Sequence, residues 1–249
     1  MTASAWDRRI ARAEKLAVSH RAAAELLTFY AEIARVQKNV YDALASTRRS
    51  DFNTTLLTRH FEPLLSLVRR IGPQPLAQGA GELTGRKASL QDLLIDPERI
   101  PEIHLFFARA LLQPYMECLA QRSDLPMVNS PSTCPFCGEK PQVGVLREVG
   151  DGAKRSLICS LCSTEWEFRR LVCAGCGEES VEKLPIYTAS EFEYVRVEAC
   201  ETCHTYIKSV DLTKNGLAVP VVDELATTAL NVWAEENGYT KLQLNLLGI

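Results

Sequence analysis

Apolar side chains recur at helical spacing through the first half of the chain. They fall three or four residues apart, which is the period of one buried face of an α-helix. Four stretches show this pattern: residues 21–45, 56–71, 89–94 and 101–121. Asp51 and Asn53 are candidate N-caps for the second stretch, because short polar side chains accept hydrogen bonds from the first free amides of a helix. We therefore expect residues 1–125 to be helical.

Prolines divide this helical half. Gly72-Pro73 and Pro75 follow the second stretch, and we expect them to end its helix. Pro63 and Pro114 lie inside two of the stretches. A proline removes a backbone donor and crowds the preceding turn, so we expect a kink at Pro63 and a bend or interruption at Pro114.

The pattern changes after Pro126 and Pro131 to short runs rich in β-branched and aromatic residues. Such runs, bounded by turn residues, predict strands. They are residues 143–147, 155–158, 165–172, 186–188, 194–198 and 206–210. Helical spacing returns over 223–237, and Gly238 is a natural residue for the end of that helix, because glycine readily adopts the left-handed conformation required there.

These patterns predict an α+β protein: an all-helical N-terminal domain, two small cysteine-bearing modules and a C-terminal helix. The expected limits are 1–130 for the helical domain, 131–170 and 171–212 for the two modules, and 213–249 for the C-terminal helix and tail.

Eight of the nine cysteines form four Cys-x-x-Cys pairs in the second half of the chain. Between the pairs lie 21, 10 and 23 residues in turn. Two pairs about twenty residues apart are typical of a zinc-ribbon or rubredoxin-like site, in which four thiolates surround one metal. A module that combined the middle two pairs would need a very short loop. The spacing therefore predicts two groups of metal ligands: Cys134, Cys137, Cys159 and Cys162 in the first, and Cys173, Cys176, Cys200 and Cys203 in the second.

The residue types predict two metal ions, each held by four cysteines, and leave iron and zinc open, because both accept tetrahedral thiolates. Gly138 and Gly177 follow the second cysteine of the two leading pairs. Glycine there can take a positive φ, and we expect its amide to approach a sulfur. Arg169-Arg170, near the cysteines, is a candidate to offset thiolate charge. The pairs Glu178-Glu179 and Glu235-Glu236 are best explained as solvated surface.

Neither site has the composition of a catalytic centre. A catalytic zinc keeps one open position and three protein ligands, whereas each group here supplies four. His204 is a possible substitute ligand but is better explained as a surface residue, and Cys118, in an apolar context, as a buried core residue. No phosphate loop, dinucleotide fingerprint or nucleophile elbow is present. The prediction is a protein that is not an enzyme.

Charge and hydropathy limit the classes of partner that the chain can bind. Residues 1–130 hold 17 Lys+Arg and 14 Asp+Glu, a net of +3, and residues 131–249 hold 11 and 17, a net of −6, which together give the overall −3. A ribbon that binds nucleic acid needs a basic groove, so the acidic second half argues against that role. Apolar runs are too short or too polar to span a bilayer, and residues 1–12 lack a signal-peptide core. We expect a cytoplasmic protein without membrane insertion.

The order of these motifs resembles the FdhE family, the formate dehydrogenase accessory proteins. The resemblance depends on four passages: Cys134-Pro-Phe-Cys-Gly138, Cys159-Ser-Leu-Cys162 with Glu165-Trp166, Glu198-Ala-Cys-Glu-Thr-Cys-His-Thr-Tyr-Ile-Lys208, and Asp223-Glu-Leu-Ala-Thr227 with Gly238-Tyr239. Family members commonly carry Asp-Asp where this chain has Asp223-Glu224, a difference that keeps the charge.

The resemblance implies a cytoplasmic maturation factor, or chaperone, with two rubredoxin-like modules that carry iron in some members. Such a factor binds the catalytic subunit of a molybdenum-containing formate dehydrogenase before twin-arginine export. Three other functions remain open from the residues alone: a rubredoxin-like electron carrier, a zinc ribbon that binds nucleic acid, and a dithiol oxidoreductase. The residues alone lead only to a helical domain with two metal ribbons, which favours a binding protein.

Overall fold

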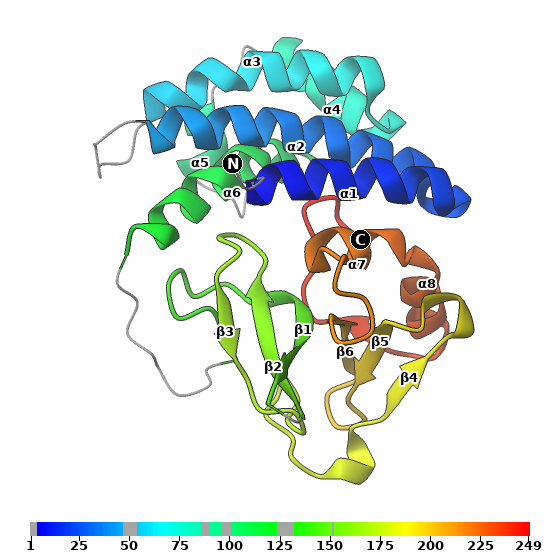
Figure 1. Ribbon diagram of the computed structural model, residues 1–249. Coiled ribbons are helices and arrows are strands. Elements are labelled where there is room, and N and C mark those ends of the chain that lie inside the picture. Colours follow the sequence, from blue (N-terminus) through cyan, green and yellow to red (C-terminus); the bar gives the residue numbers. More distant parts are fainter. Residues whose placement is uncertain (1–3, 47–53, 86–89, 96–100, 124–131, 151) are drawn as a thin grey trace.

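A layer of helices lies above a layer of strands (Figure 1). This computed structural model describes residues 4–46, 54–85, 90–95, 101–123, 132–150 and 152–249. The expected α+β architecture is confirmed: a helical N-terminal region precedes a sheet that carries the cysteines, and two further helices follow it. The limits predicted for the four domains remain a prediction.

Within the described residues the helical layer contains six α-helices. They are α1 Ala5–Ser19, α2 Ala24–Ala45, α3 Thr54–Ile71, α4 Gln74–Gly85, α5 Leu90–Ile95 and α6 Glu102–Gln121. Ser4 and Asp7 form a capping box that fixes the start of α1, each side chain accepting the other residue's backbone N–H. Buried side chains of α2 to α6, among them Ile33, Leu64 and Phe107, pack into one apolar core.

Prolines lie at the start of one helix of this layer and inside two others. α3 ends at Ile71 as expected, but α4 begins three residues later, with Pro75 as its second residue. The amides of the first helical turn have no partner within the helix, so proline, which lacks an N–H, is tolerated at that position. Pro75 therefore lies in the first turn of a helix here. Helices α3 and α6 continue through Pro63 and Pro114, so Pro114 does not interrupt its helix. The kink at Pro63 and the bend at Pro114 stay predictions. The proposed caps Asp51 and Asn53 lie outside the described residues.

The strands form one continuous sheet. They are β1 Pro141–Val149, β2 Gly152–Cys159, β3 Glu165–Glu167, β4 Ile186–Thr188, β5 Val195–Ala199, β6 Thr205–Asp211 and β7 Thr240–Lys241. Their order is β3-β2-β1-β6-β5-β4, and β7 pairs with β6. The predicted strand over 165–172 stops at Glu167, and residues 168–172 instead cross from the first module to the second.

The two modules repeat the same local topology and join edge to edge. In each, the strand that precedes a Cys-x-x-Cys turn pairs antiparallel with the strand that follows it, β2 with β3 and β5 with β6. The junction is the parallel pairing of β1 with β6, where Gly144 lies opposite Ser209. Both modules therefore face the same way along one sheet, which fixes the position of one cysteine group relative to the other.

The helix predicted over 223–237 is two helices, α7 Pro220–Ala226 and α8 Thr228–Glu236. The chain turns at Thr227, whose backbone leaves helical geometry at φ −103° and ψ 45°. The buried ammonium group of Lys208 on β6 donates hydrogen bonds to the carbonyl oxygens of Glu224 and Thr227, at 2.6 and 3.2 Å. Because these two carbonyl oxygens accept hydrogen bonds from Lys208, the helix is broken at Thr227 where the lysine side chain is bound. Gly238 follows with φ +82°, as the predicted helix end requires.

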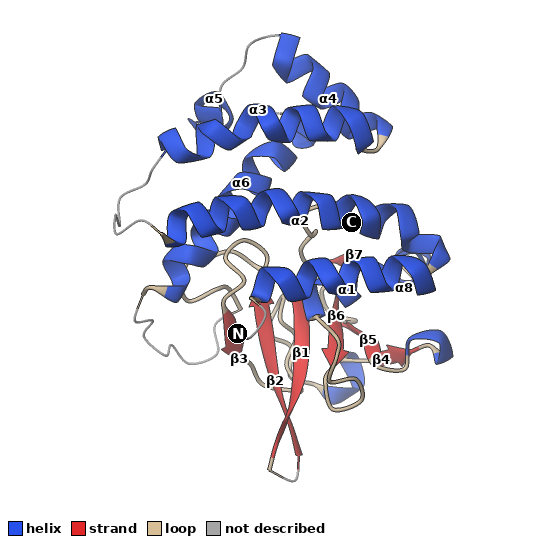
Figure 2. Cartoon of the chain, turned by 45° about the horizontal axis from the view of Figure 1, so that its top comes forward, coloured by secondary structure: helices blue, strands red, loops and turns tan. Residues whose placement is uncertain are grey.

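Helix α1 joins the helical layer to the rest of the chain. Figure 2 shows α1 crossing above the ends of the strands, beside α2. Ala13 and Leu16 of α1 pack against Val222 and Leu225 of α7 in a shared apolar cluster. The two layers are therefore held together by buried surface as well as by the connecting chain.

Candidate metal centres

The structure gathers the eight paired cysteines into the two groups that the spacing predicts. In each group the four sulfur atoms lie within 4.8 Å of one another. The first group contains Cys134, Cys137, Cys159 and Cys162, and the second contains Cys173, Cys176, Cys200 and Cys203. That these sulfurs hold metal ions remains a prediction, and its first test is whether the geometry fits one.

The sulfur atoms are spaced as metal ligands. Neighbouring sulfurs are 3.4 Å apart for Cys137 and Cys159 and 3.7 Å apart for Cys173 and Cys203. A disulfide would need about 2.05 Å. A tetrahedral site with metal–sulfur bonds of about 2.3 Å has edges of about 3.8 Å, so both groups fit a single four-coordinate ion with little movement.

The same backbone turn builds all four Cys-x-x-Cys pairs. The amide of each leading cysteine donates to the carbonyl oxygen five residues later, at 2.8 to 3.0 Å. These bonds are Cys134 to Glu139, Cys159 to Thr164, Cys173 to Glu178 and Cys200 to Thr205. The residue after each trailing cysteine has a positive φ: Gly138 at +80°, Gly177 at +78°, Ser163 at +55° and His204 at +52°. The positive φ predicted for the two glycines is confirmed.

The glycine amides, however, do not contact sulfur. Gly138 and Gly177 donate to the carbonyl oxygens of Cys134 and Cys173, at 2.9 and 3.0 Å. The sulfurs instead accept amides from inside the turn: Leu161 to Cys159 and Gly175 to Cys173, both at 3.3 Å. The expected contact is therefore corrected, because the positive φ closes the turn while the enclosed residues supply the donors that stabilise thiolate charge.

Four thiols so close together cannot all ionise without a cation. Hydrogen bonds from Cys137 and the other thiols hold the pKa of Cys134 far below its usual range, whereas contacts with Cys134 and its neighbours raise the pKa of Cys159. Like charges that share a small site resist being formed together. In the second group burial opposes ionisation of Cys203, but hydrogen bonds from Thr205 lower its pKa to about 7. Both groups are suited to a divalent cation.

The first group lies inside an apolar cluster. Cys134, Cys159 and Cys162 are at most 3% exposed, and they pack with Leu157, Trp166 and other apolar side chains. The helical layer covers this group: Gln113 on α6 donates a hydrogen bond of 2.8 Å to the carbonyl oxygen of Ser160, between two of the ligands.

The second group is open to solvent by comparison. Cys176 is exposed and Cys203 is half-buried. Glu178 links its two turns, since its carboxylate accepts hydrogen bonds from the Thr202 hydroxyl at 2.6 Å and the Ser180 amide at 2.9 Å. These bonds lower the pKa of Glu178 to about 2, with Thr202 as the largest cause. Glu178 is thus a structural residue of the turn with only 18% of its side chain exposed, which corrects its interpretation as solvated surface.

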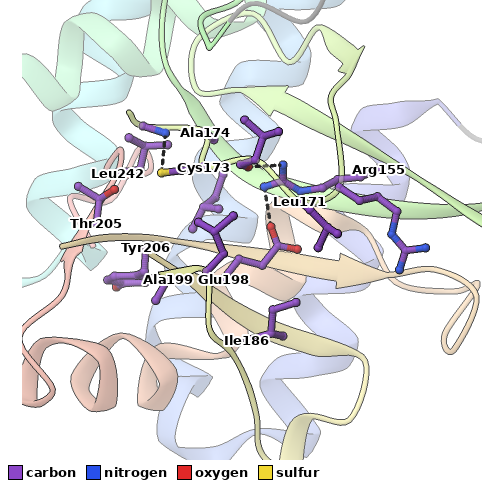
Figure 3. Close-up of a pocket in the computed structure, with 15 residues that line it drawn as sticks. Arg155, Leu171, Cys173, Ala174, Ile186, Glu198, Ala199, Thr205, Tyr206 and Leu242 are labelled. Atoms are coloured by element: carbon purple, nitrogen blue, oxygen red, sulfur yellow. Dashed lines mark hydrogen bonds and ion pairs between the residues drawn. The ribbon is translucent and has the colours of Figure 1, made fainter. Parts of the chain in front are cut away.

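A buried ion pair connects the modules, and sequence patterns gave no signal for it. Arg155 on β2 contacts the Glu198 carboxylate on β5 at 2.5 Å, with only 2% and 10% of the two side chains exposed. Burial opposes the charge on Glu198, but Arg155 and Arg196 hold its pKa below the usual value. Arg155 also donates to the carbonyl oxygen of Arg169, at 3.0 Å, in the crossing segment. Figure 3 shows the pair beside a cleft that Cys173 borders.

Three other candidate residues can now be placed. Arg169 is paired with Glu179 on the surface, at 2.6 and 2.9 Å, and does not contact the thiolates. His204 is exposed and belongs to neither group of candidate ligands found among the described residues. Cys118 is a buried residue of the helical core, as expected.

Comparison with known proteins now identifies the family. Residues 133–170 match the family model described as FdhE, central domain, and residues 171–247 match the model described as FdhE, C-terminal domain. A protein FdhE homolog from Aquifex aeolicus is 31% identical over 206 residues, which cover 80% of this chain and 72% of that protein. This chain belongs to the FdhE family.

Two further relatives mark the extent of the similarity. An FdhE homolog from Shewanella oneidensis is 32% identical over 127 residues, 51% of this chain and 42% of its own length. The crystal structure of the FdhE protein from Pseudomonas aeruginosa superposes with a TM-score of 0.75 at 24% identity, over 99% of this chain and 97% of that one. The whole FdhE-family fold of this chain, helical layer included, is therefore shared with a solved structure.

Proposed function

We propose that this protein is an accessory factor for a molybdenum-containing formate dehydrogenase. It binds the precursor of the catalytic subunit in the cytoplasm, before twin-arginine export, and is itself not an enzyme. Membership of the FdhE family supports this function. The residues add the observation that carries the proposal: two complete groups of four cysteines on one sheet, with no ligand position left open for a substrate.

The two groups serve in this proposal as sites for iron or zinc that hold the sheet in shape. Metal binding and folding are coupled in small four-cysteine modules, because the thiolates repel one another without the cation. The helical layer and the sheet then provide surfaces for a partner protein. None of the helices in the described part of the chain is long and apolar enough to cross a bilayer.

One part of the surface fits an apolar segment of the precursor. Leu171 and Ile186 line the cleft beside Cys173 (Figure 3), and they are 51% and 46% exposed. Large apolar side chains that gather at a cleft are typical of protein-binding sites. Glu178 and Glu179 are less suited to capture a basic signal peptide, because both carboxylates are already bound within the chain.

The test is co-purification of the tagged full-length chain with the catalytic-subunit precursor from formate-respiring cells, followed by mass spectrometry and metal analysis. We expect the precursor to be retained with its signal peptide. Leu171→Asp together with Ile186→Asp should abolish retention, whereas Val18→Asp, at a position 83% exposed on α1, should not. Retention of ribosomal or polymerase subunits without any dehydrogenase would contradict the proposal.

Two alternatives give different results in the same preparation. An electron carrier would show reversible reduction of bound iron, and a nucleic-acid ribbon would shift DNA or RNA at low salt. The net charge of −6 over residues 131–249, before thiolates are counted, favours neither DNA nor RNA as a partner. We expect the protein to cause no gel shift of DNA or of RNA.

A further inference from the structure

The two cysteine groups have the same backbone and different surroundings. Each leading cysteine makes the same amide bond to the carbonyl oxygen five residues later, and in each group one sulfur accepts two amides from its own turn. The bonds that a metal would make at the two sites are therefore alike. Any difference in how they release it must come from what covers the sulfurs.

The first group is covered on the helical side. Its three buried sulfurs share an apolar cluster with Trp166, Phe168 and Ala120 at the end of α6, and Gln113 binds the turn between Cys159 and Cys162 through the Ser160 carbonyl. Cys137 at the edge of this group is half-buried, whereas a chelator can reach the other three sulfurs only if α6 separates from the sheet. That separation exposes buried apolar surface and breaks hydrogen bonds, which makes it a rare opening.

The second group needs no such opening. The Cys176 side chain is exposed, Cys203 is half-buried, and none of the four cysteines belongs to an apolar cluster of the described residues. Ligand exchange at a four-thiolate site begins when an incoming ligand replaces one sulfur. Here Cys176 offers that sulfur directly to the solvent.

We propose that the second group is an exchangeable metal site, from which an incoming thiolate can take the ion, and that the first group is a fixed structural site. This inference rests on the proposed metal binding of both groups. In the exchange step Cys176 gives up its bond to the metal and takes up a proton from water, while a thiolate of the acceptor forms the new bond. Electrons are not transferred and the oxidation state of the metal is unchanged.

The chemical class of the acceptor follows from this step. It must carry thiolates in a segment extended enough to approach Cys176 at the surface, and several of them to complete the transfer stepwise. A protein segment with closely spaced cysteines, before it has received its own metal, has this chemistry. The exchangeable site therefore gives the accessory factor a second activity, the loan or removal of a soft metal ion.

The experiment uses the full chain purified with zinc in both sites. A chromogenic zinc chelator is added in excess, so that its absorbance records the released zinc. In parallel, a pulse of N-ethylmaleimide labels each cysteine as it becomes free, for identification by peptide mass spectrometry. We expect two release phases of equal amplitude that differ by at least about tenfold in rate, because only the slow one requires separation of α6. The labels in the fast phase should fall on the second group.

Two variants distinguish fast metal release at the second group from metal loss caused by misfolding. Gln113→Ala should accelerate only the slow phase, since it removes the hydrogen bond that α6 makes to the first group. Cys176→Ser should remove the fast phase and leave the slow one in place. The primary test is the pair of release rates measured on the unmodified chain, and the two variants assign each rate to one cysteine group.

The outcomes are distinct. Two zinc ions released at one rate, or early labels on Cys134, Cys137, Cys159 and Cys162, would overturn the proposal while leaving two metal sites intact. A chain that binds no metal would overturn the metal sites themselves and with them part of the proposed function. Zinc retained in the first group only, after purification in a chelating buffer, would support the proposal.

Discussion

The junction between the two modules can be tested at a single atom. Gly144 on β1 lies opposite Ser209 on β6, in the parallel pairing that makes one sheet of the two modules. A Cβ atom at Gly144 would lie 2.1 Å from the Ser209 Oγ and 3.2 Å from its Cβ. Ser209 is completely buried, so its hydroxyl cannot turn into solvent to make room. Gly144→Ala therefore forces the strands apart or strains the serine.

The loss of stability expected for Gly144→Ala follows from these distances. Rotation of the hydroxyl would remove the shorter contact, but the 3.2 Å approach of the two Cβ atoms would remain and would have to be relieved by the backbone. Overpacking of this kind costs about 1–3 kcal/mol. Urea unfolding followed by circular dichroism measures the loss, and we expect a lower midpoint with an unchanged slope, because the surface exposed on unfolding is the same.

Gly152→Ala is the matched control. Gly152 also lies in a strand of the first module, but a Cβ there would meet nothing within 4 Å, and its free energy of unfolding should change by no more than about 0.5 kcal/mol. Ser209→Ala in the Gly144→Ala background should recover about 1 kcal/mol relative to the sum of the single changes. A Gly144→Ala protein as stable as the parent, or strict additivity of the two changes, would refute the junction.

Three further predictions concern charges and turns. Glu224→Gln should cost about 3–5 kcal/mol in urea unfolding, because it leaves the buried ammonium groups of Lys208 and Lys241 without their carboxylate. Burial alone would raise the pKa of Glu224, but Lys208 and Lys241 lower it to about 2. The stability that Glu224 contributes should therefore be complete above pH 4.5 and fall towards pH 2; an acid titration in which the parent and Glu224→Gln unfold in parallel would exclude this. Gly138→Ala should cost about 1–2 kcal/mol in thermal unfolding of the metal-loaded protein, and Ser163→Gly should gain about 0.5–1 kcal/mol, because both positions have positive φ.

The cysteine groups could be predicted from the sequence because their constraint is local. Two cysteines separated by two residues determine the local backbone turn. The number of residues between two such pairs determines which pairs can share one metal site. The positive φ at Gly138 and Gly177 follows from the same turn. Ser163 and His204 occupy the equivalent positions in the trailing pairs and gave no such signal, since their residue types do not mark that conformation.

Features that depend on long-range packing could not be predicted. The break at Thr227 has no glycine or proline to mark it, and it depends on Lys208, which approaches from β6 and takes two helical carbonyls. The single sheet depends on the register of β1 with β6, whereas the spacing of the pairs describes each module by itself. No separate helix was predicted over residues 74–85, where α4 lies, because Pro75 was interpreted as part of a helix end although proline favours the first turn of a helix as well.

The adjacent acids Asp223 and Glu224 show how the helical layer and the sheet are coupled. Both are at most 1% exposed, although a pair of acidic residues in a short helix usually indicates solvated surface. Asp223 accepts a hydrogen bond of 3.0 Å from the Arg12 guanidinium on α1, whereas Glu224 contacts Lys208 on β6 at 2.9 Å. One dipeptide therefore ties α7 to both layers of the molecule.

The buried network around Glu224 depends on the length of its side chain as well as on its charge. The carboxylate of Glu224 contacts Lys208 and Lys241 and accepts a hydrogen bond of 2.8 Å from Asn245. An aspartate at the same position would keep the charge but be one methylene shorter, so it could not reach all three donors without a shift of α7. Length as well as charge is therefore determined at position 224, because in a buried network an unsatisfied ammonium group costs more than an exposed one.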